Sequence, residues 1–386
     1  MPTLERHPRM RPRLHRREEF ATERFLPAPP ALLLREPDRV TSPVLRIVLE
    51  RAREGSRPHA RDDGHVVCLA IEGGGMRGAV SAGMCVVLEA MGLVGAFDRI
   101  YGVSAGAMNA CATAAGQAAL SATHYQDAAS RGVINRMRPL LRRPVVDLDR
   151  LFDEVISARK PLSYDALASG PDFRALAVSL ETLSLRVLQR FTTIDEAMAA
   201  VRASGSLPWF GGPPHVFRGE RMTDGGVIEP IPFETALREG ASHVLVLRSR
   251  PAGYRKPPLK AFSDMLALRA APELVPLVKD AHGAYNRQAG ELERASVGGD
   301  GHLLQVAVPD HADLIARLEA NGQRVIEALR AGAQAMASAV LAAPIDLCWQ
   351  PVVYATAPMQ LAPERAGSPE GLMRGSMRGS IVPAAV

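Results

Sequence analysis

Two short apolar runs in the first third of the chain each end in a cluster of glycines. They are Val66–Ile71 and Ile100–Val103, and a stretch of small and apolar residues follows each of them. The first run is continuously apolar and rich in β-branched residues, which is typical of a parallel strand covered on both faces. The pattern between Val66 and Gly106 therefore predicts a strand, a tight turn and a helix, twice in succession.

The alternation of strands and helices continues beyond this region. Further strands are predicted at residues 173–180, 185–191, 243–247 and 303–308. Helices are predicted at residues 78–91, 107–115, 149–156, 193–204, 232–239 and 313–341, the last broken near Gly322, with proline-broken helices over 251–300. Strands that alternate with helices indicate a doubly wound α/β sheet, and the sequence holds no internal repeat.

Composition divides the chain into three parts. Residues 1–40 are rich in arginine and proline and lack periodicity, and Thr41-Ser42-Pro43 then predicts the start of a helix near 43–54 that docks on the main domain. From about Val353 the chain is rich in Pro, Gly, Ser and Met. We expect an N-terminal tail with one helix at 1–64, one large domain at 65–345 and a low-complexity tail at 346–386.

The second glycine turn has the pattern of a nucleophile elbow. In Gly102-Val103-Ser104-Ala105-Gly106 a serine stands between a predicted strand and a predicted helix, where a strained bend exposes its hydroxyl. A serine nucleophile needs backbone N–H groups that stabilise an oxyanion, and a glycine-rich turn at a helix N-terminus supplies them. We expect these donors in the first turn, which consists of Gly73, Gly74, Gly75, Met76, Arg77 and Gly78.

A base for Ser104 is the remaining requirement. Asp224 is the best candidate, because Gly225 and Gly226 let the backbone turn its carboxylate toward a neighbour. In a dyad this carboxylate accepts the Ser104 proton during attack on an ester and returns it to the leaving alcohol. An aspartate does this only where a dry pocket gives it a suitable pKa.

The motifs Gly-Gly-Gly-x-Arg-Gly, Gly-x-Ser-x-Gly and Asp-Gly-Gly, in this order, resemble those of the patatin-like phospholipase family. The resemblance runs from His65 to Arg250 and more loosely to Pro344. It implies a three-layer α/β/α domain with a mainly parallel central sheet. It also implies a Ser–Asp dyad without histidine, cofactor or metal, which cleaves carboxylic esters of lipids. Two residues depart from the family pattern: Glu72 replaces a frequent aspartate before the glycines, and Pro230 a common asparagine.

Two other interpretations of these motifs remain open. Gly73, Gly75 and Gly78 also match the dinucleotide-binding pattern Gly-x-Gly-x-x-Gly, but the acid at the expected spacing, Asp98, precedes the second strand. A Ser–Asp–His triad needs a histidine after the acid. The chain offers His243, His282, His302 and His311, none of them in a recognisable catalytic loop. For Arg77 we expect a cap on the turn, a phosphate contact or a structural ion pair.

The net charge of +5 resides at the N-terminus, because residues 1–17 hold six arginines against Glu5. Such a tail is either solvated or a polybasic segment that contacts anionic lipids at a membrane surface, and without interleaved aromatic residues it does not indicate nucleic acid. A second basic cluster is expected on a solvated face or a membrane-facing rim, and it contains Arg136, Arg138, Arg142 and Arg143.

Three further features bound the function. No apolar run reaches the roughly 18 residues of a membrane span, and no signal-peptide core opens the chain. The cysteines (Cys68, Cys85, Cys111 and Cys348) lack metal-site spacing. We therefore expect a cytoplasmic protein, soluble or peripheral to a membrane, that acts on a lipid. The alternative from another class is a binding or scaffold protein on the same fold with little turnover.

Overall fold

The computed structural model describes residues 26–27, 42–141, 143–158, 161–208, 210–258, 272–298, 301–309, 315–341 and 349–350. The tails predicted at 1–40 and 346–386 lie outside these residues except for β1 (Leu26–Pro27) and β10 (Trp349–Gln350), which pair antiparallel. Arg142, His311 and Cys348 also lie outside them. The described residues belong to one compact unit, and the boundaries expected at 64 and 345 stay predictions.

The centre of the fold is an eight-stranded sheet. It consists of β2 (Val67–Ile71), β3 (Arg99–Val103), β4 (Asp172–Ser179), β5 (Ser184–Leu188), β6 (His215–Phe217), β7 (Glu220–Asp224), β8 (His243–Leu247) and β9 (Leu303–Val306). The order is β6-β7-β4-β3-β2-β8-β9, and β5 pairs with β4 beside this path. Pairs among β4, β3, β2, β8 and β9 are parallel, and β5, β6 and β7 are antiparallel additions. The predicted mainly parallel sheet is confirmed.

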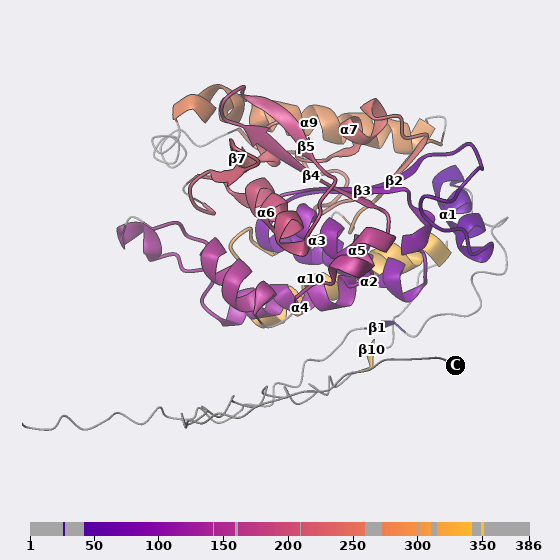
Figure 1. Ribbon diagram of the computed structural model, residues 1–386, viewed down its shortest axis with the longest axis horizontal. Coiled ribbons are helices and arrows are strands. Elements are labelled where there is room, and N and C mark those ends of the chain that lie inside the picture. Colours follow the sequence, from indigo (N-terminus) through magenta and orange to yellow (C-terminus); the bar gives the residue numbers. More distant parts are fainter. Residues whose placement is uncertain are drawn as a thin grey trace, which may run out of the picture. The chain divides into compact units, whose positions relative to one another are not determined.

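Helices cover both faces of this sheet (Figure 1). One face carries α2 (Gly78–Ala90), α3 (Ala105–Ala114), α4 (Ala118–Ser130), α6 (Ile194–Gly205) and α10 (Gly322–Leu341), and the other carries α7 (Phe233–Arg238) and α9 (Val275–Gly298). Successive residues of a strand point to opposite faces. Val67, Leu69 and Ile71 of β2 accordingly pack in the first layer, and Cys68 and Ala70 in the second. The fold is therefore the predicted three-layer α/β/α arrangement.

The remaining helical elements are short or peripheral. They are α1 (Pro43–Arg53), α5 (Tyr164–Ser169), a π-helix at Arg150–Ser157 and 3₁₀ turns at Gly75–Arg77, Val94–Ala96, Arg138–Leu141, Gly225–Val227 and Pro272–Leu274. Within the described residues, no helix combines the length and the apolar character needed to cross a bilayer.

Several elements differ from the sequence-based expectations. The helix α4 and the hairpin of β6 and β7 were not predicted. The helix predicted from Asp313 is wrong at its start, because α10 begins at Gly322. The reason is a cap: Asn321 Oδ1 accepts the Gln323 N–H at 2.9 Å, which satisfies a donor of the first helical turn. Residues 315–321 form a loop instead, and this loop reaches the first glycine turn.

The helix α1 docks on the main domain, as expected. Its apolar residues Val44, Leu45, Val48 and Leu49 are at most 2% exposed. Arg51 is also buried, and its guanidinium donates to Asp63 Oδ2 at 2.6 Å and to Asp98 Oδ2 at 2.8 Å. Apolar burial and these ion pairs together hold α1 against the beginning of β3.

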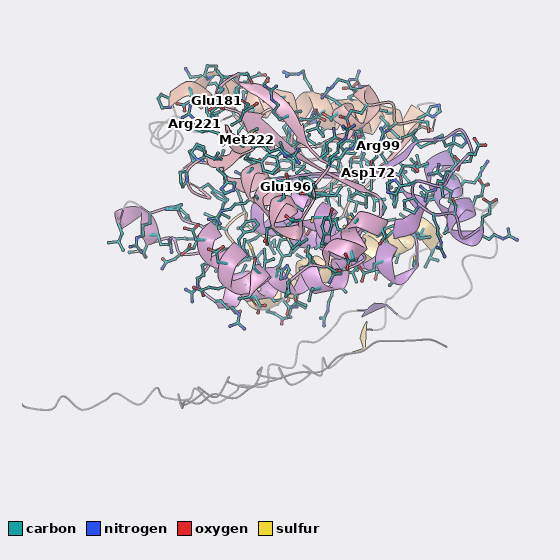
Figure 2. All side chains as sticks on the ribbon, viewed as in Figure 1. Arg99, Asp172, Glu181, Glu196, Arg221 and Met222 are labelled. Atoms are coloured by element: carbon teal, nitrogen blue, oxygen red, sulfur yellow. The ribbon has the colours of Figure 1, made fainter. Side chains whose placement is uncertain are left out.

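An exposed ion pair marks the place where β7 joins β4. Arg221 Nε on β7 donates to Glu181 Oε1 at 3.0 Å, just beyond the end of β4, and both side chains are labelled in Figure 2. The Leu180 N–H also donates to the Arg221 carbonyl at 2.9 Å. These contacts fix the register of β7, and Asp224 is the last residue of that strand.

Candidate active site

Ser104 stands at the junction of β3 and α3. Its φ of 56° and ψ of −128° lie in a region that residues with a side chain rarely adopt. The Ser104 N–H donates to Ser204 Oγ at 2.8 Å, and the Ser204 hydroxyl donates to the Leu176 carbonyl at 2.6 Å. Ser204 on α6 and Leu176 on β4 thus hold the strained bend, as a nucleophile elbow requires.

Asp224 lies close to this elbow because the carboxyl ends of β3 and β7 face each other along one edge of β4. The strand β5 pairs with residues 175–179 of β4, so β3 and β7 must both use the other edge of β4. On that edge Val103 at the end of β3 lies opposite Leu176, and Asp224 at the end of β7 lies opposite Ala177, the next residue. Since β3 and β7 run in opposite directions, their carboxyl ends face each other.

The Asp224 carboxylate is held in a nearly dry environment. It is 8% exposed, and its Oδ1 accepts the Gly226 N–H at 2.7 Å. Burial raises the pKa of Asp224, whereas hydrogen bonds from Ser104 and Gly226 and the positive charges of Arg317 and Lys256 lower it. The net direction is upward, which makes the carboxylate a stronger proton acceptor than an exposed aspartate.

The first glycine turn lies beside Ser104, but most of its N–H groups are already bonded. The N–H of Gly73 donates to the Pro230 carbonyl at 3.3 Å, that of Met76 to Arg317 at 3.1 Å and that of Arg77 to Gly74 at 3.3 Å. The Gly78 N–H donates to the carbonyl of Gly75. Among the residues that the structure describes, the N–H groups of Gly74 and Gly75 donate to no acceptor. Of the N–H groups predicted as oxyanion donors, those of Gly74 and Gly75 therefore remain the candidates.

The loop before α10 packs directly on this turn. Gly75 has a φ of 61°, and a Cβ atom at Gly75 would lie 2.8 Å from the carbonyl oxygen of Arg317. Only glycine combines this backbone conformation with this close approach. Arg317 therefore contacts the turn through its backbone, and its guanidinium lies 5.5 Å from the centre of the Phe210 ring.

A buried polar network anchors the residue before the glycines. Glu72 is 1% exposed and accepts hydrogen bonds from Arg248 Nε at 2.9 Å, the Ser249 N–H at 2.8 Å and the Tyr285 hydroxyl at 2.8 Å. The Ser249 hydroxyl donates to the Gly73 carbonyl at 2.7 Å. Of the two family departures noted in the sequence, Glu72 is linked to this turn through Ser249, and Pro230 contacts the turn through its backbone carbonyl, which accepts the Gly73 N–H.

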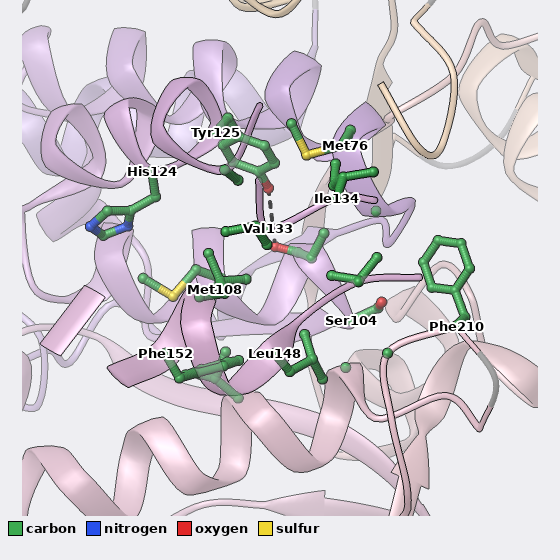
Figure 3. A pocket seen from close by; sticks show the side chains of 18 of the residues that line it. Met76, Ser104, Met108, His124, Tyr125, Val133, Ile134, Leu148, Phe152 and Phe210 are labelled. Atoms are coloured by element: carbon green, nitrogen blue, oxygen red, sulfur yellow. Dashed lines mark hydrogen bonds between the residues drawn. The ribbon is translucent and has the colours of Figure 1, made fainter. Parts of the chain in front are cut away.

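Ser104 opens onto an apolar cavity of about 120 Å³. Figure 3 shows Ser104 on the same side of this cavity as Phe210, with His124 on the opposite side beyond Met108. The other lining side chains are mostly aliphatic or aromatic and include Val133, Ile134, Leu148, Leu151, Phe152 and Ile156. A narrow apolar cavity that ends at a serine suits a hydrocarbon chain.

Ser104 and Asp224 also line a second cavity of about 210 Å³, which has a different character. Its wall includes the glycine turn from Gly73 to Gly75 and three cationic side chains, those of Arg250, Lys256 and Arg317. Gly75, Ser104, Phe210 and Arg317 belong to both walls, so the two cavities adjoin at the serine.

The histidines considered for a triad lie elsewhere. His243 begins β8 and His302 precedes β9, at the amino ends of parallel strands, whereas Ser104 follows a carboxyl end. His243 lies between the rings of His65 and His302, and burial with these neighbours lowers its pKa to about 4. His282 lies on α9 with its Nδ1 3.2 Å from the Lys279 carbonyl. The structure describes no hydrogen bond from any of these three to Asp224.

Asp98, the acid considered for dinucleotide binding, is also engaged in other contacts. Asp98 accepts hydrogen bonds from Arg51, Arg61 and the Val67 N–H at the amino end of the sheet, opposite the glycine turn. Within the described part of the chain, no group of three or more His, Cys, Asp or Glu residues is placed to hold a metal ion.

The part of the chain that contains this site matches a known protein family. The family model of patatin-like phospholipases matches residues 69–237, from β2 to α7. The chain contains a patatin-like phospholipase domain. This domain belongs to a family of lipid acyl hydrolases, and the matched range includes Ser104, Asp224 and the glycine turn.

Two individual proteins are similar to parts of the chain. The uncharacterized protein YjjU of Escherichia coli (strain K12) is 28% identical over 227 residues, which are 57% of this chain and 62% of that protein. The chain thus spans less than two thirds of this relative's length. The crystal structure of VipD from Legionella pneumophila aligns with a TM-score of 0.32 and 13% identity, over 69% of this chain and 66% of that one.

Several residues around the patatin-like site were not anticipated from the sequence. Ser204 and Phe210 lie within the matched range, whereas Arg248, Arg250 and Arg317 follow it. A usable signal existed for Arg248 and Arg250, because they directly follow a predicted parallel strand, and ligand sites gather at the carboxyl ends of such strands. Arg317 had no such signal, since its segment was assigned to a helix.

Proposed function

We propose that the patatin-like domain hydrolyses carboxylic esters of lipids through a Ser104–Asp224 dyad and an acyl-serine intermediate. The observation that carries the proposal is the meeting of β3 and β7 on one edge of β4, which directs the buried Asp224 carboxylate toward the strained serine. The apolar cavity that ends at Ser104 would hold the acyl chain.

In the first half-reaction Ser104 Oγ attacks the ester carbonyl carbon while Asp224 accepts the hydroxyl proton. The N–H groups of Gly74 and Gly75 stabilise the oxyanion, and each such donor contributes about 3 kcal/mol to transition-state stabilisation. The carbon–oxygen bond to the alcohol then breaks, and Asp224 returns the proton to the leaving oxygen. In the second half-reaction water attacks the acyl-serine by the same route and releases the fatty acid.

Intact-mass labelling with a fluorophosphonate tests the nucleophile. The wild type should gain one adduct, and Ser104→Ala should gain none and lose ester hydrolysis. Ser130→Ala, which removes an exposed serine at the end of α4, is the matched control and should label like the wild type. Labelling that persists in folded Ser104→Ala would refute the assignment, and an unlabelled wild type would favour a binding protein on this fold.

A histidine series tests the dyad against a triad. His124 lines the apolar cavity, so His124→Phe is the most demanding variant of the series. In a dyad it changes kcat/KM by no more than a few-fold, as do His243→Ala and His302→Ala. A loss of about 10³ at any single histidine, in a protein that still folds, would establish a triad instead.

A further inference from the structure

The segment between α4 and the π-helix is an excursion of the chain with a closed base. Ile134 and Val146 pair in an isolated antiparallel bridge at this base. Between them lies the 3₁₀ turn Arg138–Leu141, which projects away from the central sheet (Figure 1). We call residues 135–145 the basic tip, because they include four arginines and no acidic residue.

Hydrogen bonds within the basic tip give its backbone a defined conformation. Arg138 Nε donates to the Pro144 carbonyl at 2.9 Å, and the Arg138 guanidinium also pairs with Asp147 beside the base. The Met137 N–H donates to Asn135 Oδ1 at 2.9 Å. The side chains that the basic tip exposes are therefore presented on an ordered backbone.

Two large apolar side chains of the basic tip face solvent. Met137 is 64% exposed and Leu141 is 72% exposed, which are the highest values among the large apolar side chains that the structure describes. Apolar side chains that gather at one exposed place mark a site of contact with a partner, whereas scattered ones are ordinary. The basic tip is therefore a candidate interaction surface.

Cationic side chains flank the two apolar ones. Arg136 and Arg143 are exposed, and within the described part of the chain neither forms an ion pair with a carboxylate. Arg136 donates to the Leu318 carbonyl at 3.3 Å, a neutral acceptor that leaves its positive charge unbalanced. Apolar side chains with basic neighbours suit the surface of a bilayer that contains anionic lipids, because each basic residue near that surface adds to the binding.

A second copy of this chain fits the basic tip less well than a lipid surface does. Stable protein interfaces bury roughly 800 Å² on each partner, and two side chains supply only a small part of that area. Two copies that met at their basic tips would also bring arginines of like charge together. A bilayer accepts a small apolar insertion without a shaped counterpart, and its anionic headgroups complement the arginines.

We propose that the basic tip docks the protein on an anionic lipid surface. Met137 and Leu141 insert at the boundary between the headgroups and the acyl chains. Arg136 and Arg143 contact the anionic headgroups around them. The docking itself does not depend on the hydrolase function.

The basic tip is continuous with the candidate active site. Ile134 and Val146 at its base line the apolar cavity that contains Ser104. A docked tip therefore brings the wall of this cavity next to the bilayer, and an acyl chain can reach the serine along an apolar path. This role in substrate delivery rests on the hydrolase function proposed above.

Sedimentation of the full chain with vesicles tests the docking. Vesicles of equal parts phosphatidylcholine and phosphatidylglycerol should bind the wild type more tightly than vesicles of phosphatidylcholine alone. The combined variant Met137→Ser with Leu141→Ser should lower the partition coefficient on the anionic vesicles at least tenfold, and Arg143→Gln should lower it about fivefold. Leu237→Ser on α7 and Arg287→Gln on α9 are the matched controls in the other helix layer and should bind like the wild type. Equal binding of the wild type and the combined variant would overturn the proposal.

Tryptophan fluorescence separates the basic tip from the arginines at the N-terminus. Leu141→Trp should be quenched by brominated acyl chains in the anionic vesicles, after subtraction of the signal of the two native tryptophans. Leu237→Trp should not be quenched. A protein that binds these vesicles while Leu141→Trp stays unquenched is attached through another segment, which would overturn the proposal. A dimer in sedimentation velocity that the combined variant abolishes, without vesicle binding, would assign the basic tip to a second copy instead.

Ester hydrolysis distinguishes a failure of the docking from a failure of the proposed function. The combined variant should keep the wild-type kcat/KM on a monomeric, water-soluble ester and lose at least tenfold in rate on an ester held in the anionic vesicles. Equal losses on both substrates would show that the basic tip shapes the active site and would refute docking as its role. A wild type that binds vesicles through the basic tip, but neither hydrolyses an ester nor reacts with a fluorophosphonate, would refute the hydrolase function and leave the docking intact.

Discussion

The buried Asp224 carboxylate lowers the stability of the fold, and the same burial makes it a better base for the proposed reaction. Burial raises its pKa above the ordinary aspartate value of about 4, because the charged form has lost its water. A folded-state pKa above the unfolded value means that the folded protein binds the proton more tightly. Ionisation of Asp224 at neutral pH therefore lowers the free energy of unfolding. The ionised carboxylate is nevertheless the form that the proposed mechanism needs.

Replacement of Asp224 by asparagine should separate these two effects. We expect kcat/KM to fall by about 10³ or more, because the amide cannot accept the serine proton. The melting temperature should be unchanged or higher at pH 7, because the amide has no charge to desolvate and can still accept the Gly226 N–H. Thermal unfolding and ester hydrolysis of the same preparation check both expectations.

The pH profile of the wild type gives an independent check on Asp224. The kcat/KM value should fall as the pH drops through its pKa, with a midpoint above that of an exposed aspartate. An Asp224→Asn variant that retains activity would contradict the assignment of Asp224 as the base. An Asp224→Asn variant that no longer folds would contradict the expectation that the buried charge of Asp224 costs stability.

The glycine turn depends on the element next to it in the sheet. The strand β8 pairs with β2 in parallel, and its continuation places Arg248 and Ser249 against Glu72. Arg248 is fully buried, and it also donates to Gln305 on β9 and to Tyr285 on α9. The position of the turn is thus fixed by two neighbouring strands and a helix, and not by its own sequence alone.

Removal of the Arg248 guanidinium should destabilise the protein strongly. In Arg248→Met the Glu72 carboxylate stays buried without its ion pair, and we expect a loss of about 3–5 kcal/mol in the free energy of unfolding. The double variant Glu72→Leu with Arg248→Met should recover part of this loss. Arg221→Met, which breaks an exposed pair with Glu181, is the control and should cost no more than about 1 kcal/mol. Urea denaturation measures all three, and an equal effect of both single variants would exclude the proposed role of burial.

The compact unit as a whole includes the helix that precedes the patatin-like domain. Arg51 of α1 bridges Asp63 and Asp98, and its guanidinium also donates to the carbonyls of Ala96 and His65. The hydrogen bond from Arg51 is the main reason why the pKa of Asp63 falls to about 2. A folded-state pKa below the unfolded value stabilises the fold at pH values above the unfolded pKa.

The contribution of this ion pair should therefore vanish in acid. The melting temperature of Asp63→Asn should lie below that of the wild type at pH 7. The difference should close as the pH falls from about 4 to about 2, where Asp63 becomes protonated in the wild type. Asp62→Asn, which changes the exposed neighbour, should match the wild type throughout. A difference that persists at pH 2 would show that Asp63 acts by packing and not by charge.

Elements with a local signature could be predicted closely. The strands β2 and β3 differ from their predicted bounds by one residue, since a short apolar run next to a glycine-rich turn predicts a buried strand from local sequence alone. The helix α4 escaped prediction because Ser121, Thr123 and His124 are buried together with its apolar residues, which blurs the helical pattern. The loop at 315–321 was mistaken for helix, because the capping role of Asn321 and the contact of Arg317 with Gly75 depend on a distant partner.

The sequence by itself determined the order of strand, turn and helix, the resemblance to patatin-like phospholipases, and the identity of the candidate serine and aspartate. Each of these depends on residue types within a few positions of one another, where backbone preference and hydrophobic spacing act directly. Only the tertiary structure decided which N–H groups of the glycine turn are available, and which cations line the second cavity. Those properties arise where β3, β7 and the loop before α10 converge, and such a convergence is set by sheet register and packing between segments far apart in the chain.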